Sequence, residues 1–158
     1  MIMGILNVTP DSFSDGGQFL SASRALEQAR RMHAEGADFI DVGGESSRPG
    51  AAPVSIIEEL DRVVPVIEGI AAELPARISI DTSKPEVMTE AVSAGASMIN
   101  DVRALREKGA LETAASLGVH VCLMHMQGEP RTMQLKPSYQ DVVAEVRDFL
   151  VQRARACE

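Results

Sequence analysis

The feature that most constrains the fold of this sequence is a repeated pattern, in which a short apolar segment ends in a polar residue and a helical pattern begins. Its clearest example is the stretch ISIDTSKPE at residues 78–86. Ile78 and Ile80 have strand character, while Ser83 and Glu86 have the spacing of a helix capping box with proline in the first turn. Asp81 lies at this junction, where α/β folds carry ligand contacts.

The same pattern recurs along the chain, so we predict five strand–helix units. Strands are expected at 1–6, 39–42, 78–81, 97–99 and 119–124, and helices at 21–35, 55–74, 83–94, 105–117 and 138–158. Another capping box, from Ser55 to Glu58, opens the second helix, and the glycines at positions 36, 95 and 118 are placed to end three helices. Strands separated by helices predict parallel pairing with right-handed crossovers.

Two architectures fit this alternation, an open doubly wound sheet and a (β/α)8 barrel. An open five-stranded sheet would be complete within 158 residues, whereas a barrel needs ~250 residues. No G-x-G-x-x-G motif or P-loop follows any strand, which removes the usual support for an open nucleotide-binding sheet. Polar residues at the carboxyl end of every strand favour the barrel. These residues are Asn7, Asp41, Asp81, Asn100 with Asp101, and His125.

Composition narrows the class of partner. The net charge of -8 and the lack of a Lys/Arg cluster argue against a nucleic-acid or anionic membrane surface, so small molecules are the expected partners. No run of 18 apolar residues and no signal-peptide pattern is present, which leads us to expect a cytoplasmic protein. Cys122 and Cys157 have neither disulfide nor metal spacing and are expected to be packing residues.

The predicted strand ends form a ring of Asp and Asn side chains, which suits a neutral heterocycle with several N–H donors. A carboxylate such as Asp81 can accept two N–H bonds from an amidine-like edge, and an Asn amide such as that of Asn100 pairs with an adjacent donor and acceptor. Purely structural roles stay open as alternatives for three of these residues. In these, Asp81 flanks a helix, Asn100 caps a turn and Asp41 accepts hydrogen bonds from backbone N–H groups. Lys84 is expected to be solvated.

Five segments, taken in order, resemble bacterial dihydropteroate synthase. They are MGILNVTPDSFSDGG at 3–17, IDVGGESSRPGA at 40–51, SIDTSK at 79–84, INDV at 99–102 and CLMHMQG at 122–128. The resemblance implies a (β/α)8 TIM barrel, of which this chain would supply about the first five βα units. It also implies one pterin-binding domain over residues 1–158, incomplete at the C-terminal side. The implied reaction joins 6-hydroxymethyl-7,8-dihydropterin diphosphate to 4-aminobenzoate, giving 7,8-dihydropteroate and diphosphate in folate biosynthesis, and sulfonamides compete with the aminobenzoate.

The resemblance assigns roles by position. Asn7 matches a Mg²⁺-contacting asparagine, and the implied cofactor is Mg²⁺. Asp81 and Asn100 match the pair that recognises the pterin, and Met124 at a strand end is expected against the pterin face. The loop residues expected near the aminobenzoate and diphosphate are Phe13, Ser47, Arg48 and Pro49. Ser47 stands where the family more often has threonine, which removes a methyl contact and puts sulfonamide affinity in doubt.

Two loop residues are predicted to be catalytic. Asp15 on the first loop and Arg48 on the second are expected to pair when these loops fold over the site. The complete protein is expected to be a homodimer. Later family segments that carry a further Asp, a Lys and an Arg-x-His are missing, so this polypeptide alone is expected to be inactive. The alternatives are a pterin-dependent methyltransferase of the same barrel superfamily and a non-catalytic barrel fragment.

Overall fold

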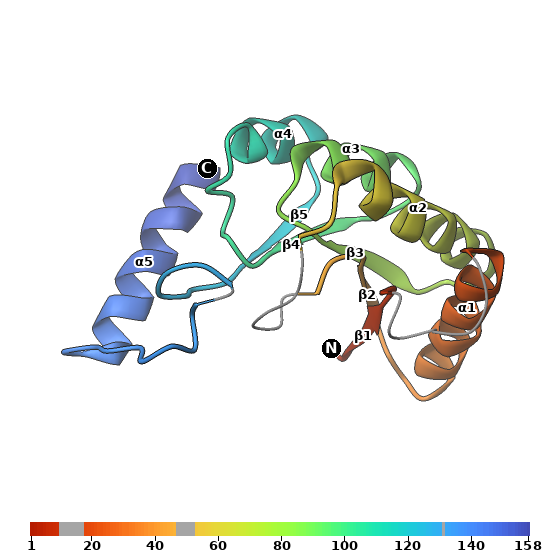
Figure 1. Cartoon of the computed structure of the whole chain (residues 1–158), viewed down its shortest axis with the longest axis horizontal. Coiled ribbons are helices and arrows are strands. Elements are labelled where there is room, and N and C mark those ends of the chain that lie inside the picture. Colours follow the sequence, from red (N-terminus) through yellow and green to blue (C-terminus); the bar gives the residue numbers. More distant parts are fainter. Residues whose placement is uncertain (10–17, 47–52, 131) are drawn as a thin grey trace.

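The computed structural model describes residues 1–9, 18–46, 53–130 and 132–158. Five strands alternate with five helices, as predicted (Figure 1). The elements are β1 (Met3–Asn7), α1 (Gln18–Ala34), β2 (Phe39–Gly43), α2 (Ile56–Glu73), β3 (Arg77–Asp81), α3 (Pro85–Ser93), β4 (Met98–Asp101), α4 (Ala110–Leu117), β5 (His120–Leu123) and α5 (Val142–Cys157). All neighbouring strands are parallel and the sheet order is β1-β2-β3-β4-β5, so each strand pairs with the next one in the sequence.

The hydrophobic core lies between the sheet and the helices α1 to α4, which follow one face of the curved sheet (Figure 1). Alternate strand residues point to this face because side chains in a strand alternate between its two sides. These residues, all nearly inaccessible to solvent, are Leu6, Ile40, Val42, Ile78, Ile80 and Ile99. They pack against buried helix residues such as Ala25 in α1, Ile67 in α2 and Met88 in α3. The buried faces of these three helices therefore point to the sheet.

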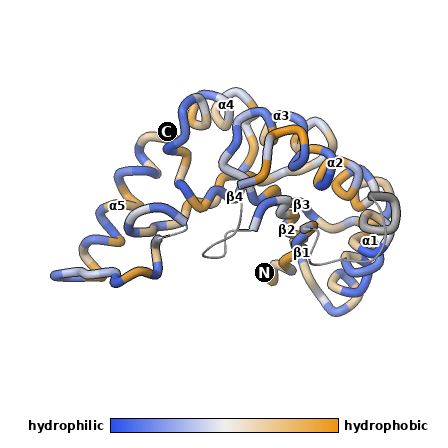
Figure 2. The backbone as a smooth tube through the Cα atoms, viewed as in Figure 1, coloured by the Kyte–Doolittle hydropathy of each residue, from blue (hydrophilic) through white to orange (hydrophobic). Residues whose placement is uncertain are grey.

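The opposite face of the sheet is not covered by a helix in the described part of the chain (Figure 1). On the β1 edge strand, which is mostly hydrophobic in Figure 2, Met3 is 38% exposed and Ile5 is 63% exposed. Among the described residues, β1 and β5 each pair with a strand on one side only. A curved parallel sheet with helices on its outer face and two free edges is the arrangement expected of part of a (β/α)8 barrel.

The predicted capping box of Ser55 and Glu58 is confirmed at the start of α2. The amide of Ser55 donates to Oε2 of Glu58 over 3.0 Å, and the amide of Glu58 donates to Oγ of Ser55 over 3.2 Å. Two backbone N–H groups that helix geometry leaves without partners are therefore satisfied reciprocally. This fixes where α2 begins.

The other predicted capping box, at Ser83 and Glu86, is wrong. Lys84 occupies the N-cap position of α3, and no side chain caps this helix. Ser83 instead donates its hydroxyl to the carboxylate of Asp101 at the end of β4. The Ser83 hydroxyl therefore makes a tertiary contact with β4 in place of the predicted local cap.

The connection from β4 to α4 also departs from the prediction. The helix expected from residue 105 begins at Ala110, because Ala104 and Leu105 adopt left-handed backbone conformations with φ of 55° and 54°. Arg153 of α5 donates Nε to the carbonyl of Ala104 over 2.8 Å and Nη2 to that of Leu105 over 2.9 Å. The strained turn is therefore held by a residue that lies 49 positions beyond Ala104 in the chain.

The last helix differs from its prediction in its start and in its burial. It begins at Val142 with Asp141 as N-cap, and the Asp141 carboxylate accepts from the amide of Ala144 over 3.0 Å. None of its residues is buried, and Val143 is 73% exposed. The apolar side chains of this helix are therefore at least partly exposed within the described chain. Across the described residues, every helix falls short of the length and apolar character that a bilayer crossing requires.

Candidate functional site

Each of the five strands contributes one residue to a register row at the carboxyl edge of the sheet. The residue from β2 is a glycine. Asn7 lies opposite Gly43, Gly43 opposite Asp81, Asp81 opposite Asn100, and Asn100 opposite Cys122. Because residues in one register row share a face of the sheet, their side chains point to the side that no helix covers in the described chain. The predicted convergence of Asn7, Asp81 and Asn100 is confirmed.

Gly43 forms the gap between two polar side chains. A Cβ placed on Gly43 would lie 3.5 Å from Oδ2 of Asp81 and 3.6 Å from Oδ1 of Asn7. Both oxygens therefore face the same small space above the glycine. Sequence reasoning did not single out Gly43, although its position two residues after Asp41 would have placed both on one face of a strand.

Asp41 and Asn100 are joined within the sheet. Asp41 is buried, and its Oδ2 accepts a hydrogen bond of 3.0 Å from Nδ2 of Asn100. This corrects the expectation that Asp41 serves backbone N–H groups. The bond fixes the Asn100 side chain and leaves its carbonyl oxygen for a ligand. Ser79 of β3 pairs with Asp41 in the register of the sheet. The Oγ of buried Ser79 and the Oδ1 of Asp41 have no hydrogen-bond partner among the described residues.

Asp81 has a strongly perturbed protonation equilibrium. Burial above all, and then nearby negative charges, raise the pKa of Asp81 from its ordinary value of 3.8 to about 7. The contributing carboxylates are those of Asp41, Asp101, Glu59 and Glu45. At neutral pH the Asp81 carboxyl is therefore close to half ionised, so a ligand with N–H donors competes with a proton for this group.

The raised pKa of Asp81 predicts a specific dependence of stability on pH. Above about pH 4 the unfolded chain ionises Asp81, whereas the folded protein keeps it protonated until about pH 7. The free energy of unfolding therefore falls as the pH rises through this range. An asparagine at this position cannot ionise. We therefore expect the Asp81→Asn variant to gain stability relative to the unmodified chain as the pH rises from about 4 to about 8. Urea unfolding over this pH range measures the difference in unfolding free energy between the two proteins. A difference that does not change with pH would contradict the raised pKa of Asp81.

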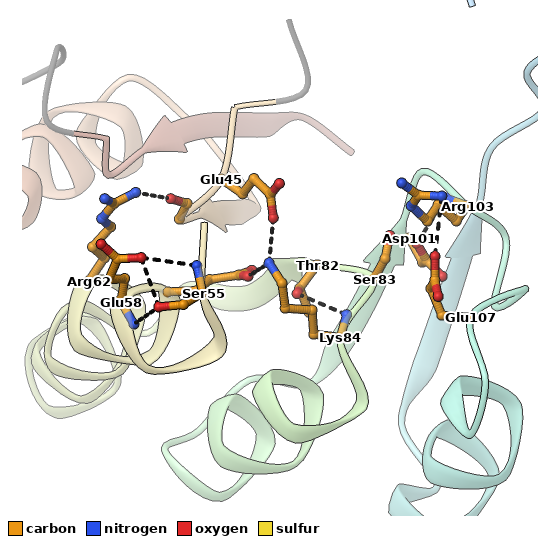
Figure 3. Close-up of polar contacts among 12 residues, drawn as sticks. Glu45, Ser55, Glu58, Arg62, Thr82, Ser83, Lys84, Asp101, Arg103 and Glu107 are labelled. Carbon is orange, nitrogen blue, oxygen red and sulfur yellow. Dashed lines mark hydrogen bonds and ion pairs between the residues drawn. The ribbon is translucent and has the colours of Figure 1, made fainter. Parts of the chain in front are cut away.

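A cavity of about 470 Å³ opens beside Asp81. Its wall includes Glu45 after β2, the turn from Asp81 to Glu86, and the segment of Val102 and Arg103 after β4. Lys84 also lines it, and its ammonium donates to the carboxylate of Glu45 (Figure 3). The same ammonium donates to the carboxylate of Glu59. The expectation that Lys84 is solvated is therefore wrong, because its ammonium forms ion pairs with two carboxylates at the cavity wall.

The remaining predicted residues have mixed outcomes. Met124 lies one residue beyond β5 and is half-buried. His125 packs against the Phe149 ring at 5.0 Å and the Tyr139 ring at 5.8 Å, which gives it a packing role. Cys122 and Cys157 are exposed, so the expectation that they are packing residues is wrong. The predicted loop residues Phe13, Asp15, Ser47, Arg48 and Pro49 lie outside the described residues.

Comparison with known proteins shows which family this chain belongs to. The pattern of the family described as "Pterin binding enzyme" matches residues 3–158. The dihydropteroate synthase of Escherichia coli (strain K12) is 58% identical over 157 residues, which are 99% of this chain and 56% of that protein.

Two solved structures resemble this chain along almost its whole length. The Yersinia pestis dihydropteroate synthase, solved with a sulfonamide drug complex, has a TM-score of 0.92 at 55% identity and is covered to 57%. The Xanthomonas albilineans enzyme with 4-aminobenzoic acid has a TM-score of 0.88 at 55% identity and is covered to 55%. In both comparisons 99% of this chain is covered, so it spans a little over half the length of the relatives it matches. By its sequence and by its fold, the chain belongs to the pterin binding enzyme family.

Proposed function

We propose that this chain forms the amino-terminal half of a dihydropteroate synthase, which joins 6-hydroxymethyl-7,8-dihydropterin diphosphate to 4-aminobenzoate and releases diphosphate. The observation that carries the proposal is the row of Asn7, Gly43, Asp81 and Asn100 at the open face of the sheet. Its support from relatives is the 58% identity to a dihydropteroate synthase and the likeness to a structure that holds 4-aminobenzoic acid. In this proposal the barrel is completed by the segments that these relatives have beyond the matched region.

In this proposal the pterin is recognised by complementary hydrogen bonds. The Asp81 carboxylate accepts two N–H bonds from the amidine-like edge of the ring, and the carbonyl oxygen of Asn100 accepts from an adjacent N–H donor. The bond from Asn100 to Asp41 holds this amide in a fixed orientation before the ligand arrives. Gly43 leaves the space above β2 open between Asn7 and Asp81, which a side chain would partly fill.

The carboxylate of Asp81 also suits the proposed chemistry. When the C–O bond to the diphosphate breaks, its electron pair leaves with the diphosphate and the ring nitrogens share the resulting positive charge. The aminobenzoate nitrogen then forms the new C–N bond and loses a proton. In its ionised form, Asp81 presents a negative charge to the ring while this positive charge develops.

Mg²⁺ belongs to the proposal as a cofactor. Asn7 is exposed at the end of β1 and offers a hard amide oxygen, the ligand type that Mg²⁺ prefers together with water and substrate phosphates. No group of three or more His, Cys, Asp or Glu side chains in the described residues is arranged to hold a metal. Asn7 would contribute one ligand to the ion, which when bound would stabilise the charge of the leaving diphosphate.

The finer assignments from the resemblance stay part of the proposal. Asp15 and Arg48 are proposed as catalytic residues, and Phe13, Ser47 and Pro49 as contacts of the aminobenzoate and diphosphate. The proposed enzyme is cytoplasmic and is a homodimer when complete. Met124, at the end of β5, is proposed to contact the face of the pterin ring.

A hybrid protein tests this proposal. Residues 1–158 of this chain would be joined to the part of the Escherichia coli synthase that follows its matched residues. We expect the purified hybrid, with Mg²⁺ and both substrates, to form dihydropteroate, while the 158-residue chain and the Escherichia coli part each form none. Product formation by the 158-residue chain would contradict its role as an incomplete half. A folded hybrid that forms no product would contradict the proposed function.

A further inference from the structure

Lys84 links three segments of the chain through a single ammonium group. It precedes α3, and its Nζ donates a hydrogen bond to Glu45, which follows β2 (Figure 3). A second hydrogen bond from Nζ goes to Glu59 in α2. The side chain of Lys84 is 24% exposed and that of Glu45 is 36% exposed, so this link is partly shielded from water. We call these three residues the Lys84 bridge.

Glu59 is the buried member of the Lys84 bridge. Its side chain is only 1% exposed, and its Oε1 has no hydrogen-bond partner in the described part of the chain. A buried carboxylate is costly unless a cation compensates it, so Glu59 requires Lys84. Burial lowers the pKa of Lys84, but the hydrogen bonds and charges of Glu45 and Glu59 outweigh this effect and raise it overall. Lys84 therefore stays charged at neutral pH.

The bridge acts on the segment that leaves β2 beside the site. Arg62 donates to the carbonyl of Gly44 over 2.9 Å, and a Cβ on Gly44 would lie 2.8 Å from Cγ1 of Val63. This close approach shows that the backbone lies directly on α2. One residue earlier, the carbonyl of Gly43 accepts a 2.8 Å bond from the amide of Val8. The bridge adds the next anchor, at Glu45, and connects it to the turn that follows Asp81.

We propose that Lys84 is a positioning residue for pterin binding: through Glu45 and Glu59 it fixes the end of β2 against the end of β3, and thereby fixes Gly43 between Asn7 and Asp81. The inference rests on the proposed function only where it concerns the pterin. Lys84 contacts no reacting atom in this arrangement. Its effect is on the spacing of the two strand ends that carry the pterin contacts.

Three variants and one control separate this role from a general effect on folding. Lys84→Met leaves the buried Glu59 without its cation and is expected to be unstable. The double variant Lys84→Met with Glu59→Gln removes the bridge without leaving an unpaired buried charge. Lys84→Arg can keep both hydrogen bonds and is the conservative rescue. Lys108→Met is the matched control, because Lys108 is an exposed lysine in the wall of the same cavity.

The first measurement uses the 158-residue chain and does not depend on activity. Val8 is 2% exposed, and its amide reports on the end of β2 through its bond to Gly43. We expect hydrogen exchange of this amide to be about tenfold faster in the double variant than in Lys84→Arg, Lys108→Met or the unmodified chain. Unchanged exchange at Val8 in a folded double variant would overturn the proposal.

The second measurement uses the hybrid protein and steady-state kinetics. We expect the double variant to raise the KM for the pterin diphosphate about tenfold with little change in kcat, since uniform binding is lost, while Lys84→Arg restores most of the affinity. Faster exchange at Val8 with an unchanged KM in an active hybrid would overturn the link to pterin binding. An inactive unmodified hybrid would count against the proposed function, while the exchange measurement would still decide the role of the bridge.

Discussion

Replacing Asp81 with alanine in the hybrid protein should lower kcat/KM for the pterin diphosphate by about 10²- to 10⁴-fold, because two hydrogen bonds to a charged group are lost at about 1.5–3 kcal/mol each. Asp81 lies in the register row with Gly43 and Asn100, on the face of the sheet that no helix covers in the described chain. Steady-state kinetics with each substrate varied in turn measures the loss.

A matched control for this variant is Asp61→Ala, which removes an exposed carboxylate from α2. It should leave kcat/KM within about twofold of the unmodified hybrid, as surface substitutions far from a site do. Circular dichroism and unfolding midpoints verify that both variants are folded. If Asp81→Ala retained the activity of Asp61→Ala, Asp81 would not be a pterin contact.

The largest loss of stability is expected from Asp101→Ala, at about 3–5 kcal/mol of unfolding free energy. Asp101 is fully buried, and its Oδ1 accepts from the amide of Arg103 over 2.8 Å and from the hydroxyl of Ser83. Its Oδ2 accepts from the buried amide of Leu105 over 2.7 Å. Alanine would leave these donors without partners, in a turn that already contains two residues with positive φ.

Urea unfolding of the 158-residue chain measures this effect. Asp148→Ala is the matched control, because the Asp148 side chain is 67% exposed and its ion pair with Arg147 lies at the surface. Such a pair contributes about 0–1 kcal/mol. A loss below about 1 kcal/mol for Asp101→Ala as well would show that the turn does not depend on the carboxylate.

The sequence was sufficient for features that depend on neighbouring residues. The order of strands and helices follows from apolar periodicity, and the three predicted helix-ending glycines all have positive φ, of 102° at Gly36, 122° at Gly95 and 64° at Gly118. The cap at Ser55 was predictable because its one partner, Glu58, lies only three residues away. The shared edge of Asn7, Asp81 and Asn100 was predictable because parallel strands all end on the same side.

Features that depend on distant residues were not predictable from local patterns. Ser83 had the same local signal as Ser55, yet its hydroxyl donates to Asp101, which lies 18 residues away. Lys84 had the pattern of a solvated residue, and its partners Glu45 and Glu59 lie 39 and 25 residues away. Which of these competing partners a side chain takes is decided by tertiary packing, and periodicity carries no information about it.

The order of the sheet has a consequence for how this protein acquires its structure. Each strand pairs with the strand that follows it in the sequence, so β1 and β2 can pair once β2 has been synthesised, and every later unit extends an existing edge. Such growth can proceed in the direction in which a ribosome releases the chain. Asn7, Gly43, Asp81 and Asn100 would then be brought side by side in this same order.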